Sequence, residues 1–200
     1  MKITYRWLQE YVDVPWDLPV LVDRLTMSGL ETEGTQDLAA GLAQVVVGHV
    51  LAREAHPNAD RLSVCTVDVG EQTCRIVCGA PNVAAGQKVP VALVGAVLSG
   101  GLQVKHARIR GVESAGMICA EDELGLGDDH SGIMVLDADL APGTPLAQAL
   151  GLEDVAVDLK VTPNRPDCLS VWGVAREIRA LTGGQLRLPS LEAGDAGAPS

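Results

Sequence analysis

Residues 54–65, with the sequence EAHPNADRLSVC, place three residue types used in catalysis and metal binding close together: His56, Asp60 and Cys65. A nucleophilic Cys/His pair needs hydrogen-bond contact between its members, and a metal ion needs three or four converging donors. The Pro-Asn pair after the histidine is typical of turns, because proline fixes φ and asparagine bonds nearby backbone. The segment is therefore interpreted as a corner between two strands, with a ligand-contacting loop and a catalytic or metal site as alternatives.

A second concentration of polar side chains lies in residues 103–111, QVKHARIRG. If this segment is extended, His106, Arg108 and Arg110 share one face at intervals of about 6.6 Å, and Lys105 adjoins them. Such a spacing suits contacts with successive backbone phosphates of a nucleic acid. The alternative interpretation is an ordinary solvated strand face.

The other candidate groups favour structural roles. In a strand, Cys74, Ile76 and Cys78 point to one face and are expected to fill the core, and no second cysteine pair completes a zinc site. The acidic run 121–123 has the ligand type of Mg²⁺, but its successive side chains point in different directions, so a solvated helical turn is expected. No metal site is predicted, and a hydrolase built on Cys65 or Cys78 is a remote alternative.

The composition limits the class of protein. The 200 residues are 47% hydrophobic and carry 26 acidic against 15 basic residues, a formal net charge of -11, which disfavours non-specific polyanion binding by the whole chain. Four of the five Trp and Tyr residues lie in the first 16 positions, so aromatic stacking on bases is poorly supplied elsewhere. Five scattered cysteines, no signal peptide and no apolar run of about 18 residues predict a cytoplasmic protein without membrane contact.

The elements that must position these residues fall into four segments. Residues 1–40 predict the first half of a small split α+β domain, in which Asp17 caps a helix. Residues 41–150 contain short strand-like runs typical of a small barrel or sandwich. Residues 151–189 predict the second half of the split domain, and 190–200 a frayed tail. Each half alone is below the roughly 40 residues needed for unaided folding, so we expect the halves to pack together with the barrel inserted between them.

The loop 162–167 joins the last predicted strand to the last predicted helix. Its two prolines stiffen the backbone, and Asp167 is predicted to cap a helix that begins near residue 168 and places Leu169 on its apolar side. Arg165 would then be left to contact a partner. The alternative role of the loop is helix entry and domain stitching alone.

Several motifs together resemble those of a known family. Four successive segments resemble the tRNA-binding domain shared by synthetase-associated proteins, an OB-type barrel; they are residues 56–62, 77–83, 109–119 and 121–126. The flanking segments resemble the N-terminal region of the bacterial phenylalanyl-tRNA synthetase beta-subunit family; they are residues 7–12, 25–31, 162–170 and 173–177. The resemblance therefore implies a mostly β fold with an α+β flank, in which an OB-type barrel is inserted into the small split domain.

The resemblance also implies a function. The family's ligase joins phenylalanine to its tRNA with ATP and Mg²⁺ in an alpha2beta2 complex, so the alpha subunit and tRNA are the expected partners, without DNA. This fragment itself is expected to be non-catalytic and to need no cofactor. The expected RNA donors are Lys105, His106, Arg108, Arg110, Arg61, Asn58 and Asn82. The alternatives are a structural or assembly module with little RNA affinity, and a free-standing tRNA-binding protein.

Overall fold

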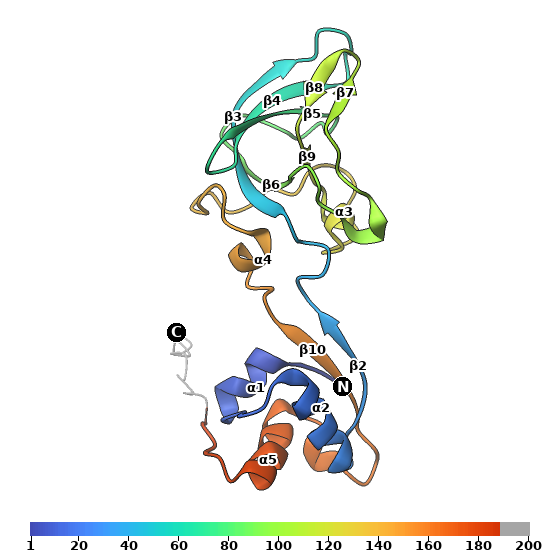
Figure 1. Cartoon of the computed structure of the whole chain (residues 1–200), viewed down its shortest axis with the longest axis vertical. Coiled ribbons are helices and arrows are strands. Elements are labelled where there is room, and N and C mark those ends of the chain that lie inside the picture. Colours follow the sequence, from blue (N-terminus) through green and yellow to red (C-terminus); the bar gives the residue numbers. More distant parts are fainter. Residues whose placement is uncertain (189–200) are drawn as a thin grey trace, which may run out of the picture. The chain divides into compact units, whose positions relative to one another are not determined.

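The computed structural model describes residues 1–188, which form two compact units (Figure 1). Unit 1 combines Met1–Leu38 with the segment that begins at Asp154, and unit 2 is the continuous stretch Ala39–Glu153. The fold is mostly β, with a nearly closed antiparallel barrel in unit 2 and a small α+β sheet in unit 1. The predicted tail 190–200 lies outside the described residues.

Unit 2 is built on a five-stranded antiparallel sheet with the strand order β5-β4-β3-β6-β9. Its strands are β3 (Val45–Ala55), β4 (Ser63–Asp68), β5 (Thr73–Cys78), β6 (Lys88–Ala92) and β9 (Met117–Ile118). The 11-residue strand β3 pairs with both β4 and β6, which lets the sheet curl around a core. The predicted inward face is confirmed, because Cys74, Ile76 and Cys78 are all buried there together with Cys65.

A hairpin of β7 (Ala107–Ile109) and β8 (Val112–Ser114) covers the open edge of β5. The amide of Ala115 donates to the carbonyl of Arg75 at 2.9 Å, and the amide of Val77 donates to Ser114 Oγ at 3.0 Å. These bonds nearly close the barrel. Three short helical segments complete unit 2: η1 (Ser99–Gly101), α3 (Glu121–Leu124) and α4 (Leu146–Ala149).

Residues 103–111 do not form one continuous strand, because the regular strand covers only Ala107–Ile109. Strand β7 begins at Ala107, because Val104 is already engaged elsewhere. The Val104 amide donates to Ala96 O and its carbonyl accepts from Gly95 N, both at 2.8 Å. The chain therefore turns between this pairing and the hairpin, and Lys105 and His106 lie outside the regular strand.

As far as residue 188, unit 1 consists of an antiparallel sheet with the order β1-β10-β2, three α-helices and one 3₁₀ turn. The elements are β1 (Lys2–Thr4), α1 (Tyr5–Tyr11), α2 (Leu18–Met27), β2 (Glu31–Asp37), β10 (Val155–Lys160), η2 (Pro166–Cys168) and α5 (Val171–Thr182). Strand β10 lies between two strands from the beginning of the chain, and one buried cluster draws residues from both segments. The helix α1 was not predicted from the sequence. None of the helices within residues 1–188 has the length and apolarity needed to cross a membrane.

Of the two helix caps predicted from the sequence, one is present in the structure and the other is not. Asp17 caps α2 as predicted, its Oδ1 accepting from Val20 N at 3.1 Å. The predicted Asp167 cap is wrong, because residues 166–168 form the 3₁₀ turn η2 and α5 starts only at residue 171. Ser170 caps α5 instead, with Oγ accepting from Gly173 N at 3.1 Å. Leu169 consequently precedes the helix and is 64% exposed rather than lying on its apolar side.

Candidate nucleic-acid interface

Residues 56–62 form a corner between β3 and β4, as predicted, and this corner also bonds the β7–β8 hairpin. His56 is buried, and its Nδ1 accepts a hydrogen bond from Asn58 N at 3.1 Å. Its Nε2 lies 3.1 Å from Ile109 O, which can only accept, so the ring is the tautomer with its proton on Nε2. Both ring nitrogens are therefore occupied. The Asp60 carboxylate is exposed and has no partner among residues 1–188.

The corner holds the tip of the β7–β8 hairpin. Asn58 Nδ2 donates to Arg110 O at 3.0 Å, next to the His56 contact with Ile109. Arg110 and Gly111 form the two-residue turn, with φ of 46° and 92°. The prediction that Arg110 continues the strand face of Arg108 is therefore wrong, because the backbone has already turned at residue 110.

Some of the expected RNA donors lie beside this corner, namely Asn58, Arg61 and Arg110. Lys105, His106, Arg108, Arg110 and Arg61 are all exposed. The side chain of Arg61 and that of Arg110 line one shallow depression beside the corner, together with Asn58 and Asp60. A second depression, which shares Arg61, extends to Arg53 and the 79–81 loop. The tertiary structure thus gathers cations that are more than forty positions apart in the chain.

Asn82 is engaged in a different way from the other predicted donors. Its Nδ2 donates to Ile133 O and its Oδ1 accepts from Ile133 N, both at 2.9 Å. Gly132 lies against the same side chain, since a Cβ at that position would come within 2.4 Å of Asn82 Oδ1. The carboxamide therefore fastens the 131–133 loop to the barrel, a role that its sequence position did not reveal.

The Lys and Arg residues of unit 2 are alike in having no ion-pair partner among residues 1–188. Unit 2 contains seven Lys and Arg residues, and none of them forms an ion pair within the described part of the chain. They are Arg53, Arg61, Arg75, Lys88, Lys105, Arg108 and Arg110. Arg53 and Arg75 were missed as candidates because they stand alone in strands, where an alternating exposed arginine is common. The barrel therefore presents unneutralised positive charge despite its acidic total.

The charges of unit 2 are also segregated along the chain. Residues 39–113 carry seven basic and five acidic side chains, whereas residues 114–153 carry eight acidic side chains and no Lys or Arg. The run 121–123 forms the one-turn helix α3, as expected. Asp122 pairs with His130 at 2.8 Å and raises the pKa of that imidazole, and Glu123 Oε2 accepts from Ala120 N at 2.7 Å. The excess of acidic over basic side chains in unit 2 therefore comes entirely from residues 114–153.

The thiols do not support nucleophilic chemistry. Cys65 is fully buried, and burial raises its pKa to about 11; burial also raises the pKa of Cys119 to about 12 and that of Cys78 above its ordinary value. A reactive cysteine needs the opposite shift and access to solvent. The hydrolase alternative therefore has no site among these residues.

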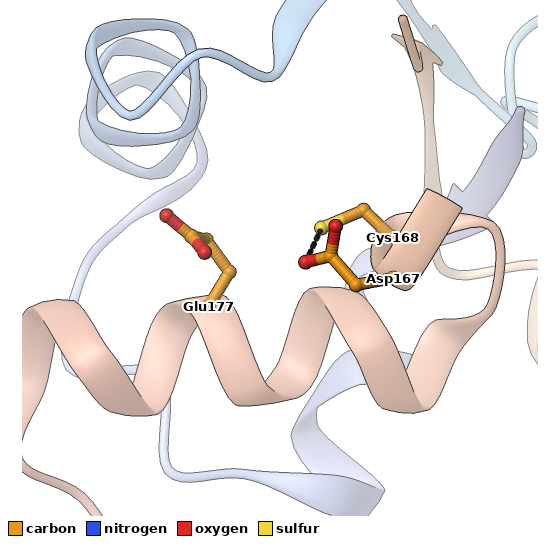
Figure 2. A group of neighbouring side chains, drawn as sticks. All are labelled: Asp167, Cys168 and Glu177. Carbon is orange, nitrogen blue, oxygen red and sulfur yellow. Dashed lines mark hydrogen bonds between the residues drawn. The ribbon is translucent and has the colours of Figure 1, made fainter. Parts of the chain in front are cut away.

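Asp167, Cys168 and Glu177 in unit 1 have the ligand types and spacing of a metal site (Figure 2). A guanidinium, however, already holds all three. Arg165 Nη2 donates to Asp167 Oδ2 at 3.1 Å, to Cys168 Sγ at 3.0 Å and to Glu177 Oε2 at 2.7 Å. Arg165 therefore supplies, from within the chain, the positive charge that neutralises the carboxylates of Asp167 and Glu177.

Arg165 is therefore not left to contact a partner, and that prediction is wrong. Its Nη1 also donates to Ser28 O at 3.2 Å, which links the end of α2 to the loop before α5. Hydrogen bonds from Arg165 lower the pKa of the Asp167 carboxyl, and burial with a bond to Asp167 raises the pKa of the Cys168 thiol to about 11. Arg165 therefore links the end of α2, the turn η2 and the helix α5 through its hydrogen bonds.

Replacing Arg165 with Met should destabilise unit 1 by about 2 kcal/mol, because it leaves two carboxylates without their cation in a partly screened site. Urea unfolding measures the change. Arg176→Met is the matched control, since Arg176 is exposed on α5 and forms no ion pair with the described residues. Equal stability of the two variants would contradict the role assigned to Arg165.

The chain is similar to known proteins over its whole length. Residues 45–145 match the family model described as "Putative tRNA binding domain". The chain is 51% identical over 199 residues to the phenylalanine–tRNA ligase beta subunit of Nitratidesulfovibrio vulgaris. This alignment covers 99% of this chain and 25% of that protein. It is 50% identical over 199 residues to the beta subunit of Geobacter sulfurreducens, covering 100% of this chain and 25% of that one.

Among solved structures, the "MetRS related protein from Pyrococcus horikoshii" aligns with a TM-score of 0.39 and 21% identity, over 50% of this chain and 86% of that one. The chain spans about a quarter of the length of the curated relatives it matches.

Proposed function

Because the chain belongs to the family of the "Putative tRNA binding domain", we propose that unit 2 binds tRNA through the sugar-phosphate backbone. The observation that carries the proposal is the set of seven Lys and Arg side chains that have no ion-pair partner within residues 1–188. Unpaired exposed guanidinium and ammonium groups are the donors that phosphate oxygens require. Arg61, Arg108 and Arg110 surround the corner and the hairpin tip and form the centre of the proposed interface.

The composition of unit 2 supports backbone contacts over base contacts. All five Trp and Tyr residues of the chain lie outside residues 39–153, and the chain has no Phe. Stacking on aromatic rings is the usual way in which proteins hold unpaired bases. The proposed interface therefore uses Lys105, His106 and the arginines as phosphate donors, with Asn58 already placed at the hairpin by its bond to Arg110 O.

We further infer that the chain acts as the N-terminal accessory region of a phenylalanine–tRNA ligase beta subunit, on the strength of about 50% identity to such subunits. The ligation step, with its ATP and Mg²⁺, would then belong to other parts of an assembly with an alpha subunit. This chain would contribute tRNA binding and subunit architecture. A reducing cytoplasm suits its five free cysteines.

Fluorescence anisotropy of labelled tRNAPhe, titrated with the 200-residue chain at about 50 and 200 mM salt, tests the proposal. We expect binding at the lower salt and a loss of affinity at the higher salt, with about 0.7 to 0.9 in the logarithmic slope for each phosphate contact. The excess of acidic over basic side chains in unit 2 favours the alternative of a structural module. Absence of any salt-sensitive signal at tens of micromolar would support that alternative.

A further inference from the structure

A depression in unit 2 lies between strand β5 and the β7–β8 hairpin. Arg75, His106, Arg108 and Glu113 contribute its polar side chains. Its volume is about 290 Å³, well above the roughly 10–15 Å³ that one water molecule needs on the same measure, so a phosphate group has room there. Arg75 was not a candidate in the sequence, and the tertiary structure brings it to the predicted basic segment.

The position of Arg75 follows from strand alternation and from the closure of the barrel. Its neighbours Cys74 and Ile76 are buried, so the Arg75 side chain lies on the outer face of β5. Its carbonyl accepts from Ala115 N at 2.9 Å, and the next pair along, Val77 N and Ser114 Oγ, bonds at 3.0 Å. The backbone of Arg75 is therefore fixed directly beside the end of β8.

Arg108 reaches the same depression from β7. Its Nε donates to Gly111 O at 3.2 Å, across the hairpin turn, which restrains the guanidinium and leaves the two Nη groups for a ligand. Glu113 is the partner of Arg108 in the strand register, yet the two side chains form no ion pair. Two arginines, one histidine and a single glutamate thus line one depression.

We propose that this depression binds one phosphodiester group of the RNA backbone between Arg75 and Arg108, with His106 as a third donor. The inference rests on the proposed function and specifies one of its contacts. Two arginines from separate strands can each donate to a different non-bridging oxygen, and the planar fork of N–H donors in each guanidinium matches the geometry of phosphate oxygens. Glu113 faces the same anion and weakens its binding.

The first test compares tRNA affinities by anisotropy at fixed low salt. Arg75→Gln and Arg108→Gln are each expected to weaken binding about fivefold to tenfold and to reduce the logarithmic salt slope by about 1. Because both side chains contact one phosphate, the double variant should lose less than the product of the single losses. Glu113→Gln should strengthen binding about threefold, since it removes a like charge from the site.

Arg179→Gln is the matched control for the loss of one positive charge. Arg179 is exposed on α5 in unit 1, and its side chain forms no ion pair with the described residues. If wild-type chain binds tRNA and Arg108→Gln weakens it, while Arg75→Gln behaves like Arg179→Gln, the phosphate site is overturned and the proposed function stands. If wild-type chain shows no salt-sensitive binding, the proposed function fails.

A second measurement decides the site without tRNA. Arginine Nε–H resonances of the ¹⁵N-labelled chain are followed during titration with dimethyl phosphate. We expect the resonances of Arg75 and Arg108 to shift together along one saturation curve, and Glu113→Gln to move that curve to lower ligand concentration. Arg75 and Arg108 shifts no larger than that of Arg179 would overturn the proposed site.

Discussion

Replacing Arg108 and Arg110 together with Glu should lower the tRNA affinity of the chain at low salt by more than about a hundredfold. The change removes two phosphate donors and puts two carboxylates in their place, so lost attraction and new repulsion add. Arg108 and Arg110 line two different depressions, so the double reversal affects both. Anisotropy titration with labelled tRNA at about 50 mM salt measures the loss.

The matched control reverses two charges in unit 1. Arg176→Glu with Arg179→Glu alters the net charge by the same amount on the exposed side of α5, and neither arginine has an ion-pair partner among residues 1–188. We expect this control to lose less than about threefold, through long-range repulsion alone. Equal losses in the two double variants would mean that net charge, rather than the hairpin, governs binding. Far-UV circular dichroism establishes that both variants fold.

Replacing Gly173 with Ala is expected to destabilise unit 1 by about 3 kcal/mol or more, the upper range for overpacking. A Cβ at this position would lie 1.7 Å from the carbonyl oxygen of Asp167 and 2.7 Å from its carbonyl carbon. Both atoms belong to the backbone of the turn η2, which Arg165 fastens to α2 and α5, so the turn cannot yield to a new methyl group. The close approach of two backbone segments therefore requires glycine here.

Tryptophan fluorescence reports this change for unit 1 alone, because Trp7, Trp16 and Trp172 all lie in that unit. Gly34→Ala is the control, since it lies in β2 of the same unit and a Cβ there would have no atom within 4 Å. Urea unfolding followed by fluorescence should shift strongly for Gly173→Ala and little for Gly34→Ala. Similar midpoints for the two variants would show that the turn and α5 are not held at this distance.

The segregation of charge along unit 2 indicates which of its segments belong to the proposed interface. The acidic stretch 121–139 has no Lys or Arg, and its loop 131–133 is fastened to the barrel by Asn82. We therefore expect RNA to contact the corner and the hairpin, where the unpaired cations lie, rather than the acidic stretch. A local basic surface can in this way bind a polyanion although the chain carries a net charge of -11.

Local features of the fold were predictable from the sequence by itself. The inward face of β5, the Asp17 cap of α2 and the corner at residues 56–62 all follow from alternation, capping and turn chemistry, which depend on neighbours a few positions away. The barrel and its family were also predictable, because each family motif is a run of contiguous residues that can be recognised without the tertiary structure.

The tertiary structure alone decided whether each candidate side chain is bonded within the protein or open to a ligand. Arg165, expected to be open to a partner, is held by Ser28 and Glu177, and Asn82 is held by Ile133. Arg75, in contrast, is brought beside Arg108 without any carboxylate within ion-pair distance. Whether a charged or polar group is satisfied or open depends on atoms within about 4 Å, and folding supplies those atoms from positions far away in the chain.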